Sequence, residues 1–371
     1  MNVFYNGKFY KGEFETKNGI FTEVRIAGDE DMSDPDYVIP GLIDIHTHGR
    51  INEDFSFVDE EKTKKLLLSY AGCGVTSVLA TTMTNEPGAV ANSVSACGNV
   101  IKMQENFNPE YSTGMARLIG IHMEGPFLGK DKKGAHDEKY LRNFDYAWQD
   151  EMIERSGNHV KIISVDPTLP GAFEFIKKYT GKNITLSLAH SSAAYDTALK
   201  AAEAGANHVT HLFNAMNPLN HREPGIIGAA YDAQMFSEII CDLIHVSKTV
   251  IRMWFNMCPD KMIIISDSMR AAGLPDGEYS IGGLPVIVKD KKATLYDGTI
   301  AGSTADVFSE MKNVIEAGVT RENAILAATW NPALSINEKN IGRIEKECAA
   351  DYIIADKNFN IKQIYIRGEE I

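Results

Sequence analysis

The sequence has few cysteines, and their arrangement does not indicate a covalent or thiolate framework. The five cysteines, at positions 73, 97, 241, 258 and 348, are odd in number, and no two of them have CxxC spacing. They lie in apolar surroundings, which is typical of buried free thiols. We therefore expect neither a disulfide scaffold nor a thiolate zinc site.

Long hydrophobic runs are also missing. No segment approaches the roughly 20 apolar residues that a membrane-spanning helix needs, and the opening MNVFYNGKFYKGEF has no apolar core of signal-peptide length. The sequence therefore predicts no membrane association and, by default, a cytoplasmic location.

Positive charge does not accumulate in any part of the chain. Lys and Arg number 37 against 50 Asp and Glu, for a formal net charge of −13, and the Lys pairs are scattered among acidic residues. This pattern offers no basic face to a nucleic acid, so we expect no nucleic-acid partner. An anionic substrate would have to be bound by a few local groups.

The sequence does contain a regular alternation of strand-like and helical segments from Gly41 onward. Between the strand-like runs, apolar residues recur three and four apart, as in amphipathic helices. There are eight such runs, at residues 42–48, 76–82, 118–125, 160–166, 185–190, 208–214, 238–245 and 262–267. Eight βα units predict an α/β fold of the closed (β/α)8 type, the TIM barrel, rather than an open sheet.

The two chain ends have a different pattern, with short alternating strands and turn signals. We expect residues 1–40 and 337–371 to form one small β-sandwich-like domain, beside a catalytic barrel of residues 41–336. After the last barrel strand, residues 269–303 are rich in Gly and Pro and predict a long loop with a hairpin. Loops of that length commonly serve a functional site.

Residue types that bind metals or transfer protons close five of the eight predicted strands. The carboxyl ends of parallel barrel strands meet at one face, so these side chains are expected to converge. Any one of the histidines could equally be a structural, hydrogen-bonded residue, but packing does not predict the whole set. The residues are His46 and His48, Glu124, His190, His211 and Asp267.

The set predicts a metal site, because imidazole nitrogen and carboxylate oxygen are the ligands of ions such as Zn²⁺. Glu124, His190 and His211 suffice for one ion. The alternation of a strand places His46 and His48 on the same face, where they could hold a second ion bridged by Glu124. One ion or two stays open. We expect Zn²⁺, with Fe, Co or Mn as alternatives.

Asp267 is the candidate catalytic acid/base. A carboxylate above the barrel can accept a proton from the attacking water and later return it to a leaving group. The structural alternative is that Asp267 caps the N-terminus of the segment that follows, because Asp is a common cap.

The motifs PGLIDIHTHG, HMEGPFL, LAHSSA, THLFNAMNPLNHREPG, ISDSM and IAGS together resemble the N-acetylglucosamine-6-phosphate deacetylase family of the amidohydrolase superfamily. The first motif alone is typical only of the superfamily, whereas HMEGPF, HLFNAM and REPG are more specific. The resemblance implies metal-dependent removal of the N-acetyl group from N-acetylglucosamine 6-phosphate, giving glucosamine 6-phosphate and acetate. It places this reaction in amino-sugar catabolism and cell-wall sugar recycling, and it also implies a homodimer.

Two other branches of the superfamily resemble the chain less well. Hydantoinase-like members carry a carbamylated lysine at the end of strand four, where this chain has VKIISVDPT with Lys161 at the beginning of the run. Adenosine-deaminase-like members carry a His-Ala-Gly-Glu element after strand five, where this chain has AHSSA. The deacetylase resemblance is therefore preferred.

The same resemblance implies roles for individual residues. Glu124, His190 and His211 would hold the principal metal, and Asp267 would be the acid/base. The substrate would contact Ala135, His136, Asn214, Ala215, Arg222, His245, Ile300, Ala301 and Gly302. Structural alternatives stay open, because Arg222 could pair with Glu223 at the surface and residues 300–302 could form a small-residue turn.

Two other functions also stay open. One is deacetylation of another amino-sugar phosphate, such as N-acetylgalactosamine 6-phosphate, because the orientation of one hydroxyl leaves no readable trace in sequence. The other is a non-catalytic scaffold with the amidohydrolase fold. The complete set of metal-binding residue types argues against a scaffold.

Overall fold

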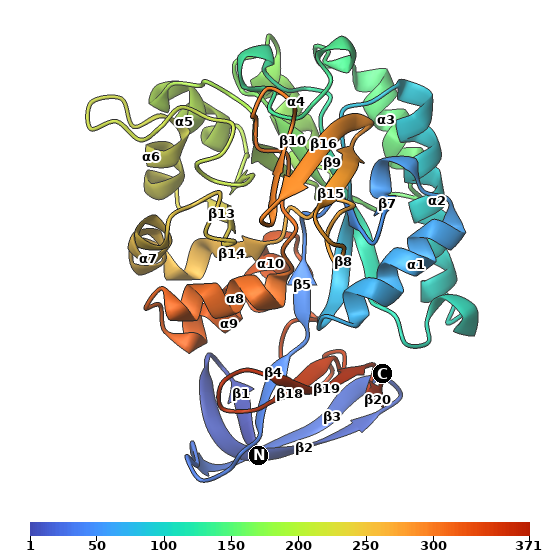
Figure 1. Cartoon of the computed structure of the whole chain (residues 1–371), viewed down its shortest axis with the longest axis vertical. Coiled ribbons are helices and arrows are strands. Elements are labelled where there is room, and N and C mark those ends of the chain that lie inside the picture. The colour runs from blue at the N-terminus through green and yellow to red at the C-terminus, as the bar shows by residue number, and fades with distance from the viewer.

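Eight parallel strands form one sheet, in the order β14-β13-β12-β11-β10-β9-β8-β5, in the computed structural model, which describes residues 1–371. Between the first and last strands, just beyond their ends, the Asp267 N–H donates to the His46 carbonyl at 2.9 Å. The strands therefore form a nearly closed barrel, which confirms the predicted TIM-like fold (Figure 1). They are β5 (Leu42–Asp44), β8 (Val75–Thr82), β9 (Arg117–Glu124), β10 (Val160–Val165), β11 (Thr185–Leu188), β12 (His208–Val209), β13 (Phe236–Ile240) and β14 (Met262–Ile265).

Continuous burial explains why these runs become barrel strands. Every residue of β8 and β13 is buried, as expected for strands covered on both faces. Several strands end earlier than predicted: β5 ends at Asp44 rather than at residue 48, β12 at Val209 rather than at residue 214, and β13 at Ile240 rather than at residue 245. Beyond these ends the backbone leaves the sheet geometry and carries the candidate site residues.

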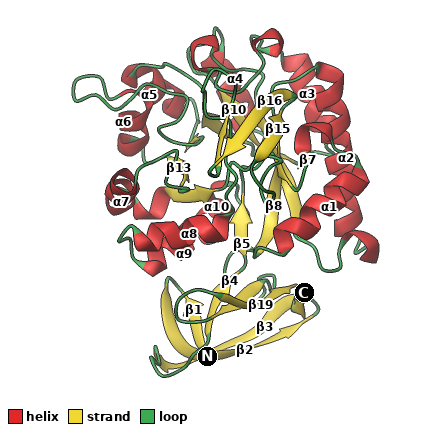
Figure 2. Cartoon of the chain, viewed as in Figure 1, coloured by secondary structure: helices red, strands yellow, loops and turns green.

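Helices surround the barrel (Figure 2). Several begin at a side-chain cap: Asp59 accepts from the Lys62 N–H, and Asp306 forms a capping box with Ser309. Their apolar faces pack against the sheet in one large buried cluster. The helices are α1 (Glu60–Ala71), α2 (Pro87–Glu105), α3 (Tyr146–Arg155), α4 (Ala172–Thr180), α5 (Tyr195–Glu203), α6 (Gly225–Asp232), α7 (Lys248–Met257), α8 (Val307–Glu316), α9 (Arg321–Ala328) and α10 (Trp330–Ser335). None of them is both long enough and apolar enough to span a bilayer.

The two chain ends build a separate seven-stranded sheet, in the order β20-β19-β18-β4-β1-β2-β3. β4 lies between the two termini, because it pairs with β1 in parallel and with β18 antiparallel. Figure 1 shows this sheet below the barrel, at the end where β5 starts. Its strands are β1 (Asn2–Tyr5), β2 (Lys8–Lys17), β3 (Ile20–Asp29), β4 (Tyr37–Pro40), β18 (Tyr352–Ala355), β19 (Ile361–Ile366) and β20 (Glu369–Glu370). The division into domains at 1–40, 41–336 and 337–371 stays a prediction.

A third, three-stranded sheet lies over the other end of the barrel. It consists of β15 (Gly277–Ile281), β16 (Leu284–Lys289) and β17 (Lys292–Thr294), in the region that the sequence predicts as a long loop with a hairpin. Its apolar residue Ile281 packs with Met83, Ala135 and Met269 in a small buried cluster. This cluster forms part of the cover over the carboxyl ends of the strands. A short hairpin of β6 (Gly49–Arg50) and β7 (Glu53–Asp54) follows His48.

Candidate metal and substrate site

The predicted residues converge at the carboxyl end of the barrel, around a cavity of about 310 Å³. Three candidates do not line it: His46 is fully buried beneath it, Ala301 is buried behind its wall, and Arg222 is exposed. The cavity is lined by His48, Met83, Glu124, Gly134, Ala135, His136, His190, His211, Asn214, Ala215, His245, Asp267, Ile281, Thr299, Ile300 and Gly302.

Backbone turns at the strand ends place three of the side chains. His190, His211 and Asp267 have left-handed φ values of 45°, 29° and 45°, a conformation that costs energy for any residue other than glycine. Hydrogen bonds hold two of these turns, since the His211 N–H donates to Glu238 and the Asp267 N–H to the His46 carbonyl. Strain of this kind is typical of functional sites.

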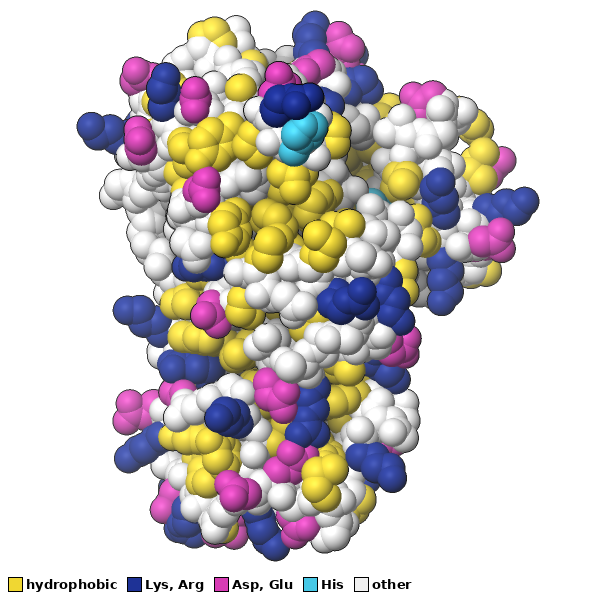
Figure 3. Space-filling view, turned by 90° about the vertical axis from the view of Figure 1, so that its left-hand side faces the viewer, with side chains coloured by type: hydrophobic (Ala, Val, Ile, Leu, Met, Phe, Trp, Pro, Cys, Tyr) yellow, Lys and Arg dark blue, Asp and Glu magenta, His cyan; other side chains and the backbone are white.

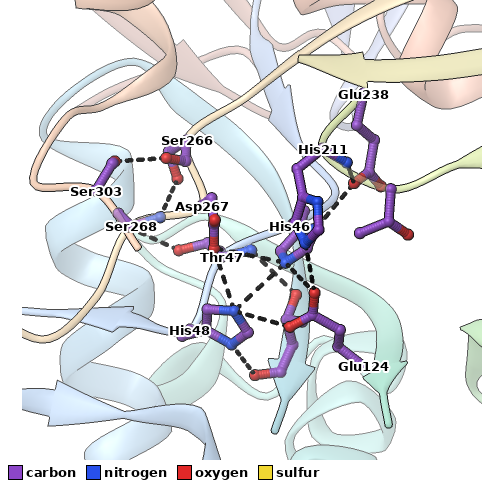
Figure 4. A network of polar contacts seen from close by, with 12 residues as sticks. His46, Thr47, His48, Glu124, His211, Glu238, Ser266, Asp267, Ser268 and Ser303 are labelled. Atoms are coloured by element: carbon purple, nitrogen blue, oxygen red, sulfur yellow. Dashed lines mark hydrogen bonds and ion pairs between the residues drawn. The ribbon is translucent and has the colours of Figure 1, made fainter. Parts of the chain in front are cut away.

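Glu124, at the end of β9, is the centre of the cluster. Its Oε1 lies 3.1 Å from His190 Nε2 and 3.0 Å from His211 Nε2. Its Oε2 lies 3.2 Å from His48 Nε2 (Figure 4). Burial would raise the pKa of Glu124, but the charge on His46 and the other histidines holds it well below its ordinary value. The carboxyl is therefore ionised.

Two of the histidines are anchored through their other ring nitrogen. His190 Nδ1 lies 2.8 Å from the Lys132 carbonyl, and His48 Nδ1 lies 3.3 Å from the Thr81 carbonyl. A carbonyl only accepts, so each Nδ1 carries a hydrogen, and Nε2 is the ring nitrogen left for a metal ion. Both Nε2 atoms face the Glu124 carboxylate, an arrangement that a divalent cation between them would satisfy. The donor set therefore fits a metal ion.

Glu238 is a functional candidate that the sequence reasoning missed. It lies on β13, fully buried, and its Oε2 is 2.8 Å from His46 Nδ1 and 3.2 Å from the His211 backbone nitrogen. Burial would raise the pKa of Glu238, but His46 lowers it below the ordinary value. The only available signal was a carboxylate inside a run of otherwise apolar strand residues.

His122 lies close to His46 and Glu238, but its contacts are structural. The three residues form a compact buried group. His122 Nδ1 is 3.1 Å from the Ile45 carbonyl and its Nε2 is 2.8 Å from the Ser164 hydroxyl, so both ring nitrogens have partners. Burial lowers the pKa of His122 to about 3. This neutral ring supports the barrel interior beneath the site.

Asp267 faces the same cluster from just beyond the end of β14. Its Oδ1 lies 3.2 Å from His48 Nε2 and 3.6 Å from His46 Nε2. Burial would raise the pKa of Asp267, but the charge of His46 and the hydrogen bond with His48 lower it to about 2. Asp267 is therefore an ionised carboxylate that can accept a proton. No helix begins after it, so the helix-capping interpretation is wrong.

His136 offers a hydrogen-bond donor to the cavity. The Thr84 N–H donates to its Nδ1 at 3.2 Å, so the ring hydrogen sits on Nε2, which lies 3.3 Å from Glu124 Oε2. Burial and the neighbouring His190 lower the pKa of His136 to about 4. The ring is therefore neutral and presents an N–H group.

His245 is held by Asp242 on the opposite wall. Its Nδ1 lies 2.7 Å from Asp242 Oδ2, while the other carboxylate oxygen accepts the backbone N–H groups of Ile244 and His245. Burial would raise the pKa of Asp242, but its hydrogen bond with His245 lowers it. The pair leaves Nε2 of His245 free for a ligand in the cavity.

The remaining substrate candidates divide into two groups. Ala135, Asn214, Ala215, Ile300 and Gly302 line the cavity. Arg222 lies on the loop between β12 and α6, where its backbone N–H donates to Asn220 and its guanidinium forms no ion pair. The pairing of Arg222 with Glu223 is therefore not formed, and the structure does not bring Arg222 to the cavity of its own chain.

Comparison with known proteins places this site in a family. The sequence profile of the amidohydrolase family matches residues 37–371. The chain is 35% identical over 298 residues to the N-acetylglucosamine-6-phosphate deacetylase of Bacillus subtilis, a match that covers 77% of this chain and 74% of that protein. It is 31% identical over 334 residues to the Vibrio furnissii deacetylase of the same name, covering 89% and 82%.

The chain belongs to the amidohydrolase family, among its N-acetylglucosamine-6-phosphate deacetylases. A solved structure of this deacetylase family supports the same conclusion. It is a mutant of the Mycobacterium smegmatis N-acetyl-D-glucosamine-6-phosphate deacetylase in complex with N-acetyl-D-glucosamine-6-phosphate. It superimposes with a TM-score of 0.90 at 26% identity, covering 100% of this chain and 97% of the other. The family expected from the sequence motifs is therefore confirmed.

Proposed function

We propose that this protein hydrolyses the acetamide of N-acetylglucosamine 6-phosphate to glucosamine 6-phosphate and acetate, in amino-sugar catabolism and cell-wall sugar recycling. The observation that carries the proposal is the convergence of histidine Nε2 atoms on Glu124, beside an ionised Asp267, in a cavity of a deacetylase-family chain. The anchored rings and the turned strand ends support a site that is formed before substrate arrives.

Glu124, His190 and His211 would hold one metal ion, and His46 and His48, with Glu124, would supply the donors for a second ion if two are bound. The imidazole and carboxylate donors favour Zn²⁺, with Fe, Co or Mn as alternatives. A bound ion would supply Lewis-acid stabilisation of the developing negative charge and would lower the pKa of water.

Asp267 transfers the proton in the proposed reaction, and His136 stabilises the carbonyl oxygen. Asp267 Oδ1 accepts the proton of the attacking water and returns it to the amine nitrogen as the C–N bond breaks. Its depressed pKa ensures that it begins the cycle ionised. The Nε2–H of neutral His136 donates a hydrogen bond to the carbonyl oxygen, which strengthens as negative charge develops there.

The substrate residues follow from the walls of the cavity. His245, together with the Asn214 and Ala215 segment, would bind the phosphate, since Asp242 holds Nδ1 of His245 and leaves Nε2 available to the cavity. Ile300 and Gly302 would lie beside the acetyl methyl, with Ala301 packed behind them.

We extend the proposal to a homodimer. Large apolar side chains are exposed on one side of the barrel, near α6 and α7, and Figure 3 shows hydrophobic side chains gathered on this face. They include Leu219, Tyr231, Met253 and Met257, which are 54%, 42%, 55% and 45% exposed. An apolar patch of this kind favours a protein interface. Arg222, on the same loop as Leu219, would then reach the phosphate in the partner's cavity.

A reducing compartment, such as the cytoplasm, fits the state of the cysteines. All five are free thiols, and four of them are buried. Burial raises the pKa of Cys97 to about 12, which keeps this thiol protonated and unreactive.

The decisive test is an acetate-release assay across acetylated hexosamines, with and without the 6-phosphate, together with metal analysis of the purified protein. We expect activity on N-acetylglucosamine 6-phosphate, at least about one ion per chain, and loss of activity without the phosphate. A preference for N-acetylgalactosamine 6-phosphate would favour the epimer alternative. Full metal occupancy without acetate release would contradict the proposal.

A further inference from the structure

A second cavity, of about 620 Å³, lies at the junction between the terminal sheet and the barrel. Three turns form it: residues 16–19 between β2 and β3, residues 107–114 after α2, and residues 366–369 between β19 and β20. The middle segment leads directly into the start of β9. The cavity is therefore at the amino end of the barrel strands, opposite the candidate active site, and it shares no residue with that site.

Arg367 brings to this cavity a cation that has no salt-bridge partner, although the charges of Asp351 and Glu369 act on it. Its guanidinium is half-buried, forms no ion pair and donates no hydrogen bond, because only its backbone N–H is bonded, to Asp351. The neighbouring Arg117 is the residue that pairs with the Asp351 side chain. Burial and the charge of Arg117 lower the pKa of Arg367. An unpaired, partly desolvated arginine is costly unless an anion joins it.

Phe107 lies beside Arg367 in an unfavourable conformation. It has a φ of 54° just after the end of α2, a position where glycine is preferred, and its side chain is 73% exposed. Its ring centroid is 5.6 Å from the Arg367 guanidinium carbon. A strained and exposed phenylalanine gains little from packing within the chain. It does offer an aromatic face to a ligand in the cavity.

Polar groups complete the lining. Lys17 is exposed and forms no ion pair, so it supplies a second cation. The Ser112 hydroxyl has no hydrogen-bond partner, and Thr113 lies next to it. Glu369 is the only carboxylate in the lining and can accept hydrogen bonds from hydroxyl groups. Its negative charge disfavours ligands that carry several phosphates.

We propose that this cavity binds a nucleoside monophosphate. The phosphate pairs with Arg367 and Lys17, the base stacks on Phe107, and the ribose hydroxyls meet Glu369. The volume lies within the range of roughly 300–1,000 Å³ that is usual for small-molecule sites. Because both the terminal sheet and the barrel contribute residues, a bound ligand joins the two and stabilises the folded chain.

Calorimetric titration of AMP into the full-length protein tests the proposal. We expect saturable binding of one AMP per chain. Arg367→Gln should weaken it by about tenfold or more, because a charge-assisted contact is lost. Arg367→Lys should retain part of the affinity. Phe107→Ala should weaken AMP binding at least about fivefold while leaving the binding of inorganic phosphate unchanged.

Two controls separate this cavity from other phosphate sites. Arg155→Gln, on the exposed surface of α3 where Arg155 pairs with Glu151, should leave AMP binding unchanged. His245→Ala should also leave it unchanged, because His245 lines only the catalytic cavity. Absence of saturable AMP binding at millimolar concentration would overturn the proposal. So would equal affinity in folded Arg367→Gln protein, or loss of binding in the His245 variant.

Discussion

Glu238 Oε2 lies 2.8 Å from His46 Nδ1, beneath the floor of the catalytic cavity. Both side chains are fully buried, and they connect β13 to the segment that follows β5. The carboxylate holds the hydrogen on Nδ1 and turns Nε2 toward Glu124, which is the role that an outer carboxylate plays for a metal-binding histidine.

Glu238→Gln should therefore weaken metal binding by about 10- to 100-fold, because the amide loses the negative charge that supports His46. Chelator competition with the purified variant measures this affinity. Glu310→Gln is a matched control: Glu310 is a buried carboxyl on α8, and burial raises its pKa well above the ordinary value, so it is already neutral. Equal weakening in both variants would mean that any buried carboxyl change disturbs the site.

Asp267→Asn should keep the bound metal and lose turnover by about 10²- to 10⁴-fold, because asparagine cannot accept the proton of the attacking water. Steady-state acetate release and metal analysis on the same preparation measure the two effects. Substantial residual turnover with full metal occupancy would rule out Asp267 as the proton carrier.

His136→Ala should lower kcat by about 10²- to 10³-fold while changing KM little, because its Nε2–H acts mainly on charge that develops in the transition state. The structure keeps this ring neutral, with the Thr84 N–H donating to Nδ1. Unchanged kcat together with weaker substrate binding would instead make His136 a residue of ground-state recognition.

Metal binding should depend on pH through His48. Burial opposes its charge, but Asp267 and Glu124 raise the pKa of His48 to about 9 in the metal-free protein. An ion bound at His48 must displace this proton, so the affinity for that ion should rise about tenfold per pH unit from neutrality up to pH 9, then level off. Titrating metal-free protein between pH 6 and pH 9 measures the slope. If the affinity for an ion at His48 did not change with pH, His48 would not be a metal ligand.

The raised pKa of His48 has the opposite effect on the stability of the metal-free protein, which should be highest at low pH. The folded state raises the pKa of His48 from 6.5 to about 9, so the stabilisation is complete below pH 6.5 and is lost as pH rises through 9. The unfolding temperature of the metal-free protein, measured across this pH interval, should fall as the pH rises.

Asp242→Asn should raise KM for the phosphorylated substrate by about tenfold with little change in kcat, because the carboxylate that holds His245 in place is lost. In the structure, His245 Nδ1 lies 2.7 Å from Asp242 Oδ2. Measuring KM for substrates with and without phosphate separates this role from a structural one. A fall in kcat without a change in KM would place Asp242 in the chemistry instead.

The barrel and the central site residues could be predicted from the sequence because both depend on local order. Buried runs such as β8 and β13 alternate with amphipathic helices, and this alternation allows few topologies. Histidines and carboxylates at strand ends then meet by geometry alone, as His190, His211 and Glu124 do. These contacts follow from fold class rather than from details of packing.

Other features depend on contacts between residues far apart in the chain. The partner of His46 is Glu238, 192 positions away, and local sequence does not signal such a pair. The hydrogen on His136 is placed by Thr84, which lies 52 positions away in the loop between β8 and α2. Arg222 has the residue type expected for phosphate, yet its loop carries it to the surface of its own chain.

The sequence by itself determined the parallel barrel, the family and the residues that can hold a metal, because periodicity and residue type are local properties. Only the tertiary structure decided which ring nitrogen carries each hydrogen and which carboxyls are ionised. It also revealed that the Arg367 guanidinium, at the far end of the barrel, has no salt-bridge partner. Burial and the nearest charges set these properties, and both arise when distant segments are packed together.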